Sequence, residues 1–314
     1  MGTLQNGLKA GLNTTWTLGK IIFPITILVV ILQYTPVLPW LVGLVAPFMG
    51  LFGLSGEAAI PLVLGNALNL YAGIAGVLSL ELTVKEVFII AVMLSFSHNL
   101  FIETGVALKV GVKLWIVLLV RFGLAAMSGI IINLLWKGGG ETAQYGMVPK
   151  TDSIPTGWLE LVMLGVQKAS FGVLQLALIV IPLMIVVQLL KDRNYLQRFS
   201  EKLGPFTKVI GVQSNASMTL VAGLVIGLAY GAGIMIQAVH EHGVSKKDAT
   251  LAFIFLVACH AVIEDTLLFV PLGIPVLPLL IIRVITAFVL TIIVAFIWKR
   301  TELQKKKGAS IAND

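Results

Sequence analysis

Apolar residues run through this 314-residue chain in stretches that are too long for a soluble domain. No Asp, Glu, Lys or Arg occurs in residues 21–56, 169–190 or 209–240. A helix that crosses a bilayer needs about 20 predominantly apolar residues, whereas the strands of a membrane β-barrel alternate in segments of about ten residues. The pattern therefore predicts an all-α polytopic membrane protein.

The same order of apolar and polar positions occurs twice along the chain. The pair Trp136-Lys137 recurs 162 residues later as Trp298-Lys299. The same offset relates His98 to His260, Thr104 to Thr266 and Arg121 to Arg283. Upstream the offset is 158 residues, and it relates Pro24 to Pro182, Pro47 to Pro205, Phe48 to Phe206, Gly53 to Gly211, Gly65 to Gly223 and Gly73 to Gly231. Two homologous repeats are typical of membrane transporters, whose site lies where the copies meet.

Each copy contains the same parts, and these parts set the expected domains. A long helix that holds a proline comes first, two short polar motifs follow it, and a helix that holds one arginine closes the copy. We expect a first membrane repeat at residues 7–137, a polar linker at 138–157, a second membrane repeat at 165–299 and a basic cytoplasmic tail at 300–314. Because the polar motifs interrupt apolar sequence, broken or re-entrant helices are expected at them.

Charge is scarce, and its distribution indicates topology. Charged residues make up 12% of the chain, against about 25% in soluble proteins. The net charge of +7 is concentrated at the C-terminus and in the middle of the chain, and positive residues that flank spans mark the cytoplasmic side. Residues 33–53 carry no charge, whereas their counterpart, residues 191–211, is rich in Lys and Arg. Equivalent parts of the copies then face opposite sides, which predicts an inverted repeat.

Two polar motifs in each copy carry the candidate chemistry. We call residues 54–59 (LSGEAA) and 212–217 (VQSNAS) the first polar motifs. Residues 97–104 (SHNLFIET) and 259–266 (CHAVIEDT) are the second polar motifs. An ionisable side chain inside the membrane costs roughly 2.5–3.5 kcal/mol on insertion scales, so it usually faces a cavity or another polar group. All four motifs are expected to converge near the centre of the membrane.

The motifs support two functional interpretations. In the first, Ser55 and Ser214 mark the starts of half-helices whose N–H groups point at a bound solute. In the second, the carboxylates together with His98 and His260 bind a cation or relay protons. The structural alternatives are helix caps at Ser55 and Ser214 and a purely structural polar network around the histidines. The spacing of the histidines and carboxylates does not by itself identify a metal.

Several further polar residues lie inside apolar helices. Arg121 and Arg283 either reach the membrane surface or form a supporting ion pair with a carboxylate. Asn66 and Asn69 share one helix face, where they either touch the solute or hydrogen-bond a neighbouring helix. The candidate solute-binding residues are Ser55, Glu57, Asn66, Asn69, His98, Asn99, Glu103, Gln213, Ser214, Asn215, His260, Glu264 and Asp265.

The polar motifs resemble those of the Gate-domain family, also called nucleoside-recognition-domain proteins. The resemblance is carried by GLSGEAAIPLVLG at residues 53–65, SHNLFIETG at 97–105 and CHAVIEDT at 259–266, and it covers most of both copies. Related Gate domains form the membrane part of the ferrous-iron transporter FeoB and are similar to parts of concentrative nucleoside transporters, and spore-maturation membrane proteins belong to the same group. The resemblance implies a multi-pass protein of a prokaryotic inner (cytoplasmic) membrane.

These observations lead to one main functional expectation and one alternative. We expect a permease for a small polar or ionic solute, nucleoside-like or a cation, with its site between the two repeats. The alternative is a non-transporting partner or scaffold subunit that acts with another membrane protein or as a homo-oligomer. No P-loop, GxSxG, HExxH or CxxC pattern occurs, so neither an enzyme nor a cofactor is expected. The expected partners are the lipid bilayer and the solute, without nucleic acid.

Overall fold

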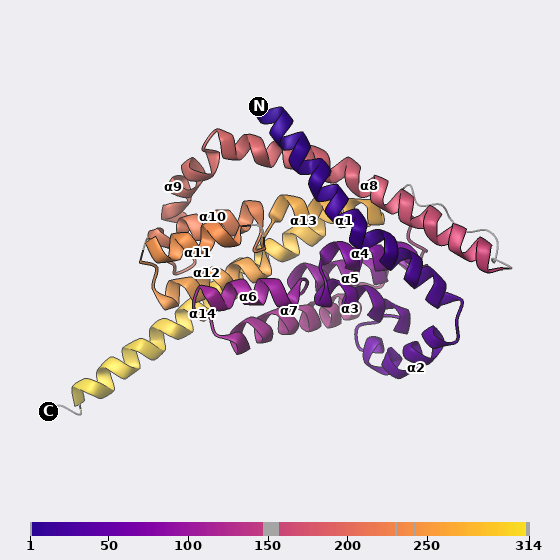
Figure 1. Ribbon diagram of the computed structural model, residues 1–314. Helices are drawn as coiled ribbons and strands as arrows, with labels where there is room; N and C mark the ends of the chain where they lie inside the picture. Colours follow the sequence, from indigo (N-terminus) through magenta and orange to yellow (C-terminus); the bar gives the residue numbers. More distant parts are fainter. Residues whose placement is uncertain (1, 147–156, 230, 242, 312–314) are drawn as a thin grey trace. The chain divides into compact units, whose positions relative to one another are not determined.

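A computed structural model describes residues 2–146, 157–229, 231–241 and 243–311 as a series of helices (Figure 1). In chain order the helices are α1 (Thr3–Gln33), α2 (Val37–Gly50), η1 (Gly56–Ala58), α3 (Ala59–Ala67), α4 (Leu70–Ser79), α5 (Val84–Phe96), α6 (Leu100–Lys109), α7 (Leu114–Leu135), α8 (Trp158–Asp192), α9 (Tyr195–Thr207), η2 (Ser214–Ala216), α10 (Ser217–Ile226), α11 (Ala232–Glu241), α12 (Lys246–Ala258), α13 (Val262–Leu268), η3 (Val270–Leu272) and α14 (Val276–Ile311).

Six segments within the described ranges are long and apolar enough to cross a membrane. They are Thr3–Leu32, Val84–Lys109, Leu114–Leu135, Trp158–Leu190, Lys246–Leu268 and Val276–Glu302. The described part of the chain holds no β-strand and only one isolated bridge, between Thr83 and Thr142. These observations confirm the predicted all-α polytopic class.

The chain forms two compact units, and each unit takes segments from both halves of the sequence. The first unit comprises Met1–Ile102, Arg121–Arg193 and Val262–Leu280. The second unit comprises Glu103–Val120, Asn194–Ala261 and Ile281–Asp314. Most of α6 therefore belongs to the unit that holds α9 to α12, whereas α13 belongs to the unit that holds α1 to α5. The boundaries of the two sequence repeats remain predictions.

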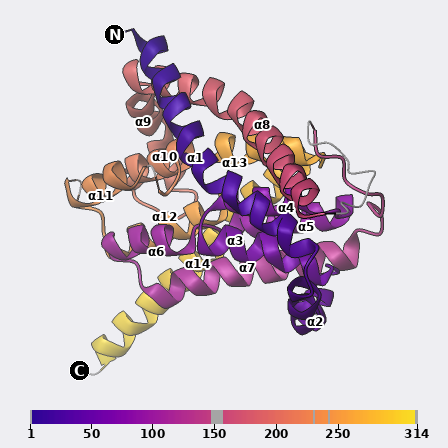
Figure 2. The same cartoon turned by 45° about the vertical axis from the view of Figure 1, so that its right-hand side comes forward.

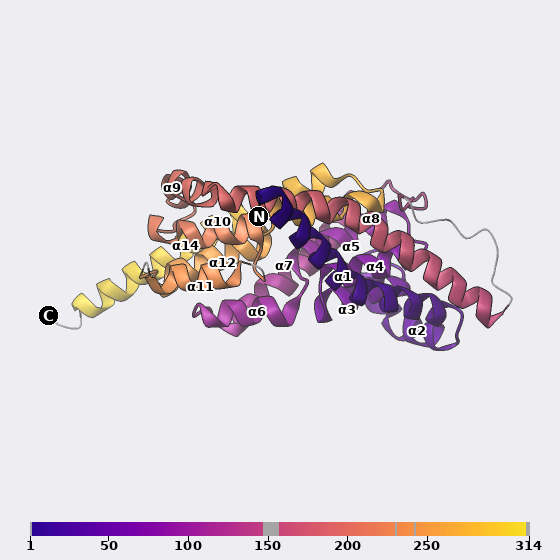
Figure 3. The same cartoon turned by 45° about the horizontal axis from the view of Figure 1, so that its top comes forward.

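In the first unit, the long helices α1 and α8 lie side by side in all three views (Figures 1–3, with Figure 2 and Figure 3 turned by 45°). A Cβ atom added to Gly7 would lie 2.7 Å from the Cα of Ile185, and one added to Gly165 would lie 3.3 Å from the Cα of Ile27. Low numbers in α1 face high numbers in α8, so the helices are antiparallel. Glycine permits this close approach because it lacks a side chain.

The contacts between α1 and α8 are reciprocal at the predicted offset of 158 residues. Gly165 is the counterpart of Gly7, and Ile185 is the counterpart of Ile27. Gly7 lies against Ile185, and Gly165 lies against Ile27, so the offset of 158 residues converts one contact into the other. A local two-fold axis that exchanges α1 with α8 would produce this reciprocity, and it would give these two equivalent helices the opposite directions that they have.

The second and fifth candidate spans are broken near their middles. The first break separates α5 from α6 at residues 97–99, and the second separates α12 from α13 at residues 259–261. Asn99 and Ala261 adopt left-handed φ values of 48° and 41°. The N–H of Asn99 donates to the Gly65 carbonyl at 2.8 Å, and that of Ala261 donates to the Gly223 carbonyl at 3.0 Å. The predicted broken helices are thus present at the second polar motifs.

The inner and outer helices differ in burial. Residues 87–96 of α5 and 248–258 of α12 are all buried. In contrast, α1, α7, α8 and α14 expose large apolar side chains, including Trp16, Leu119, Leu178 and Ile285. Exposed side chains of this kind match the hydrocarbon of a bilayer rather than water. The broken spans are therefore the protein interior, and the unbroken helices are suited to contact lipid.

The described part of the predicted linker packs on the loop before α5. The Val84 N–H donates to the Glu141 carbonyl at 2.9 Å, and the Ala143 N–H donates to the Leu82 carbonyl at 2.9 Å. Residues 147–156 of the predicted linker and residues 312–314 of the predicted tail lie outside the described ranges.

Candidate functional site

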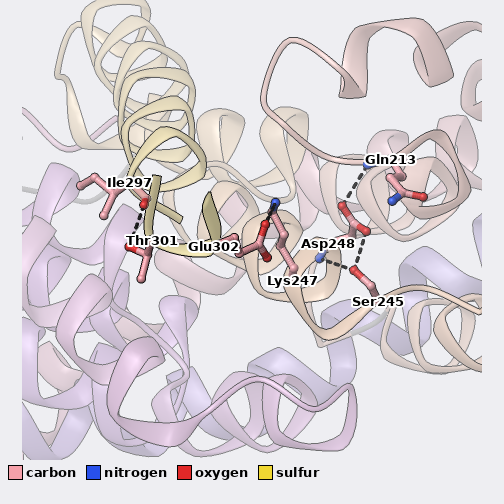
Figure 4. A network of polar contacts seen from close by, with 7 residues as sticks. All are labelled: Gln213, Ser245, Lys247, Asp248, Ile297, Thr301 and Glu302. Atoms are coloured by element: carbon pink, nitrogen blue, oxygen red, sulfur yellow. Dashed lines mark hydrogen bonds and ion pairs between the residues drawn. The ribbon is translucent and has the colours of Figure 1, made fainter. Parts of the chain in front are cut away.

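The first polar motifs are anchored to the starts of the inner helices. The Ser55 N–H donates to Glu86 Oε1 at 2.8 Å in the first unit. The Gln213 N–H donates to Asp248 Oδ1 at 3.0 Å in the second unit (Figure 4). Glu86 and Asp248 each lie in the first turn of their helix. These acidic side chains therefore tie each first motif to the N-terminal end of α5 or α12.

The same acidic residues also cap the inner helices. Asp248 accepts from the hydroxyl of Ser245 at 2.5 Å, while the Asp248 N–H donates back to that hydroxyl at 3.1 Å (Figure 4). Thr83 and Glu86 form the equivalent capping box on α5. Such a box satisfies N–H groups that a helix start leaves without an intrahelical partner. Glu86 and Asp248 were not among the candidates, although the capping-box spacing identifies them.

Within each unit, the first and second polar motifs lie at opposite ends of the inner helix. The first motif is held at the start of α5, and the second motif follows its last residue, Phe96. A helix of this length spans about 20 Å. The arrangement around α12 is the same. The structure therefore does not bring first and second motifs together within a unit, contrary to the expected convergence of all four.

The remaining candidates of the first motifs lie at or near the surface. Ser55, Gln213 and Ser214 are exposed, and Glu57 and Asn215 are partly exposed. Ser55 occupies an N-cap position without a side-chain cap hydrogen bond. Asn215 donates to the Gly243 carbonyl at 3.5 Å. These contacts favour a local structural role for the first motifs.

The second motifs place a buried histidine at each helix break. His98 and His260 are 4% and 2% exposed. His98 Nδ1 lies 2.7 Å from the Leu94 carbonyl oxygen, and His260 Nδ1 lies 2.8 Å from the Leu256 carbonyl oxygen. Each ring is thus held against the last turn of its own inner helix, and its Nε2 remains for other partners.

Each histidine lies near a carboxylate from the other half of the sequence. In the second unit, His260 Nε2 is 3.4 Å from Glu103 Oε1. In the first unit, a ring nitrogen of His98 and a carboxylate oxygen of Asp265 lie within 4.8 Å of one another. The offset of 162 residues relates His98 to His260 and Glu103 to Asp265. The two contacts are therefore reciprocal, and both are made between sequence halves.

The two buried arginines support the helix breaks. Arg121 in the first unit and Arg283 in the second are fully buried. Arg283 donates to the His260 carbonyl oxygen at 2.5 Å, and Arg121 donates to the His98 carbonyl oxygen. A positive charge at the C-terminal end of a helix is favourable because the carbonyl groups there are partly negative. Their ion pairing with carboxylates stays a prediction.

One group of polar contacts is specific to the first unit. The Tyr71 hydroxyl of α4 donates to Glu264 of α13, and both residues are buried. The Ser97 hydroxyl donates to Asn66 Oδ1 at 2.6 Å. At the repeat offsets, the counterparts of Tyr71, Asn66, Ser97 and Glu264 are Ala229, Leu224, Cys259 and Ile102. The first unit is therefore the more polar of the two around its helix break.

Three residues complete this description. Tyr71 was missed by sequence reasoning, although a buried tyrosine hydroxyl usually needs a partner. Asn69 caps α4 by accepting from the Ala72 N–H at 3.0 Å, which is a structural role. Asn99 Oδ1 is buried and has no hydrogen-bond partner within the described residues.

The comparisons with known proteins agree with this architecture. The profile of the Gate family, described as nucleoside recognition, matches residues 15–113 and 173–288. The chain is 65% identical over 294 residues to a Bacillus subtilis protein named as the uncharacterized membrane protein YvoD, and the alignment covers 94% of each chain. No solved structure matches significantly. The chain belongs to the Gate, or nucleoside recognition, family of membrane proteins.

Proposed function

We propose that this protein is a permease for a small polar or ionic solute, and that its site is formed by the second polar motifs. The observation that carries this proposal is the placement of two buried histidines beside carboxylates: His260 Nε2 lies 3.4 Å from Glu103 Oε1, and a ring nitrogen of His98 lies within 4.8 Å of a carboxylate oxygen of Asp265. Each contact lies beside a break in a candidate span. The proposed setting is the cytoplasmic membrane of a prokaryote, in line with the Bacillus relative.

Burial and helix geometry both support a site at these breaks. Ionisable residues inside a membrane are costly, and they usually mark a solute or ion pathway. Broken helices near the midplane form the sites of many transporters, because they expose backbone polar groups there. The buried oxygen of Asn99 adds an acceptor without a protein partner among the described residues. Such an atom is expected to bind water or solute.

The reciprocal origin of the contacts supports a transport cycle. Each histidine and its carboxylate come from different halves of the sequence. A relative movement of the halves would therefore separate or join both contacts. Alternating access in transporters with repeats is largely a movement of one repeat against the other around a fixed site.

The solute class follows from the groups at the site. Carboxylates, an amide and a tyrosine hydroxyl bind hydroxyl groups, amines or cations. The description of the family as nucleoside recognition favours a nucleoside-like solute, and a cation is the other candidate.

A flux experiment tests the proposal. The purified protein is placed in liposomes, and uptake of radiolabelled uridine and adenosine and of sodium and potassium ions is measured. We expect uptake of at least one probe above that of empty liposomes. The joint change Glu103→Gln and Asp265→Asn should lower this uptake at least ~10-fold, which corresponds to about 1.4 kcal/mol in the transport barrier when both buried carboxylates lose their charge. The matched control is Glu302→Gln, since Glu302 is an exposed carboxylate that contacts Lys247.

Two outcomes would contradict the proposal. Uptake that is unchanged by the joint substitution would remove these carboxylates from the mechanism. Absence of uptake for every probe, together with capture of a specific membrane protein by the full chain, would favour the partner-subunit alternative.

A further inference from the structure

We infer that helix α9 lies in the plane of the membrane surface and that the basic end of the second unit around it binds the headgroups of anionic phospholipids. This inference goes beyond the proposed permease function and does not depend on transport. It rests on the length and amphipathic pattern of α9, on the contacts that fix its far end, and on the exposed cations that these contacts bring together.

The two ends of α9 adjoin the ends of two candidate spans. The helix begins at Tyr195, directly after the candidate span Trp158–Leu190. Beyond its last residue, the Gln213 N–H donates to Asp248 Oδ1 at 3.0 Å, in the first turn of the candidate span Lys246–Leu268. A helix with the 13 residues of α9 is about 20 Å long, too short to cross about 30 Å of hydrocarbon. Both ends of α9 therefore lie at the same membrane surface.

The two faces of α9 differ in burial. Ser200 and Thr207 are buried and Leu203 is half-buried, and these positions share one helix face. The hydroxyl oxygens of Ser200 and of Ser217 in α10 are 3.0 Å apart, so this face packs on the protein. The exposed residues on the opposite face are Tyr195, Arg198, Glu201, Lys202 and Pro205. A helix with a charged outer face, placed at a membrane surface, turns that face towards the headgroups.

The far end of α9 belongs to a junction of three helix ends within the second unit, which we call the basic junction. The turn at Gly211 lies against α14, because an added Cβ would be 2.5 Å from the Cβ of Ala295. At the start of α12, Lys247 Nζ lies 3.2 Å from Glu302 Oε2 of α14 (Figure 4). The end of α9, the start of α12 and the C-terminal part of α14 therefore adjoin the same membrane surface.

Exposed cations are concentrated on the basic junction. The exposed basic side chains that the structure describes on α9, on the turn after it and on these parts of α12 and α14 are Arg198, Lys202, Lys208, Lys246, Lys299 and Arg300. The same elements carry exposed carboxylates at Glu201 and Glu302, and Glu302 contacts Lys247. Positive charge is thus in excess. A guanidinium group presents paired donors that match a phosphate, and each Lys or Arg beside an anionic bilayer strengthens binding by roughly 5-fold.

The equivalent end of the first unit provides an internal comparison. Its helix α2 is the counterpart of α9 and holds no charged residue. At the start of α5, Lys85 donates to the Asn133 carbonyl oxygen at 3.1 Å, so this cation is engaged within the protein. Anionic lipid should therefore act on α9 and not on α2.

Lipid binding by the full chain in detergent micelles tests this inference. Phosphatidylglycerol and phosphatidylcholine of equal chain length are titrated separately, and the bound lipids are counted by native mass spectrometry. Wild-type protein should bind phosphatidylglycerol more tightly, and added salt should reduce the difference because it screens exposed charges. The triple change Arg198→Gln, Lys202→Gln and Lys208→Gln should weaken phosphatidylglycerol binding at least ~10-fold and leave phosphatidylcholine binding unchanged.

The matched control removes the same charge from the first unit. Lys9, Lys20 and Lys137 are exposed there, and their joint change to Gln should alter phosphatidylglycerol binding by less than about 2-fold, since none of them belongs to the basic junction. The inference is overturned by equal affinities of wild-type protein for the two lipids. Unchanged phosphatidylglycerol binding in the α9 triple variant, or an equal loss in the control, also overturns it.

Hydrogen exchange on wild-type protein gives a local test that needs no variant. The protein is placed in phosphatidylcholine nanodiscs with or without phosphatidylglycerol. Backbone amides of residues 195–208 should exchange more slowly when phosphatidylglycerol is present, whereas those of α2 at residues 37–50 should not change. Exchange at residues 195–208 that does not respond to phosphatidylglycerol, or that slows equally in α2, would refute the assignment. Neither measurement involves solute uptake, so its outcome is separate from that of the flux experiment.

Discussion

At the scale of single residues, each helix break is held by one arginine and one histidine. Arg121 and Arg283 donate to the carbonyls of His98 and His260, and the histidines bond to their own helices. The arginines thus satisfy backbone oxygens that the break removes from the helical ladder. Unsatisfied backbone groups inside a membrane cost several kcal/mol, so these arginines are primarily structural.

Replacing Arg283 with lysine tests this role while keeping the charge. Lysine lacks the planar fork of arginine, so the His260 carbonyl should lose its donor at a cost of about 1–3 kcal/mol. We expect a lower melting temperature in detergent for Arg283→Lys and for its counterpart Arg121→Lys. Arg300→Lys is the control, because Arg300 is exposed and stacks on Phe296. Equal melting of the control and the two buried variants would contradict the assignment.

Residue types in the sequence predict the second motifs but not their partners. His98, Glu103, His260, Glu264 and Asp265 stand out because ionisable residues are rare in apolar segments. Their pairing across the sequence halves depends on how the broken helices pack, which no local pattern encodes. The role of the first motifs is ambiguous in the sequence for the same reason: a polar turn anchored at a helix start has the same composition as a polar turn at a site.

At the scale of elements, the antiparallel pair of α1 and α8 depends on the close approach of the two helix backbones. Gly7 and Gly11 lie where an added Cβ would be 2.7 Å from the Ile185 Cα and 2.8 Å from the Ile181 Cα. Long helices with a proline in each half were predicted from the sequence, and Pro24 and Pro182 indeed lie inside them. Their mutual packing was not predicted, because glycines at this spacing are equally compatible with a lipid-facing surface.

Alanine substitutions measure how strongly this pair depends on glycine. Gly7→Ala and Gly11→Ala should force the helices apart, and overpacking of this kind typically costs about 1–3 kcal/mol. The matched control is Gly123→Ala in α7, because a Cβ at Gly123 has no atom within 4 Å. That control should be neutral or stabilising by up to ~1 kcal/mol, since alanine favours helix. Thermal unfolding in detergent provides the comparison, and equal losses at all three positions would refute close packing.

At the scale of the whole molecule, the number of spans agrees with the distribution of charge. Three candidate spans precede residue 138 and three follow residue 157. An odd number in each half reverses the orientation of the second half, as the antiparallel α1 and α8 also indicate. On this count the basic segment at residues 191–208 and the basic C-terminal tail would lie on one side, which the positive-inside rule predicts to be cytoplasmic.

Reporter fusions test this topology. A reporter inserted at Gly140 and one fused after the C-terminal residue should report opposite sides of the membrane, with the C-terminal one cytoplasmic. An alkaline phosphatase and a green fluorescent protein at each position give complementary signals. The same side for both positions would exclude the inverted arrangement.

The exchange of segments between the two units has a consequence for biosynthesis. The first unit includes Val262–Leu280, and the second includes Ile281–Asp314. While the chain grows on the ribosome, Tyr71 is synthesised long before its partner Glu264, and Glu103 is synthesised long before its partner His260. Neither unit is complete until the segments after residue 261 have been synthesised, so the early helices lack part of their packing partners until then. Separate expression of the two halves would leave each without a segment that only the other supplies.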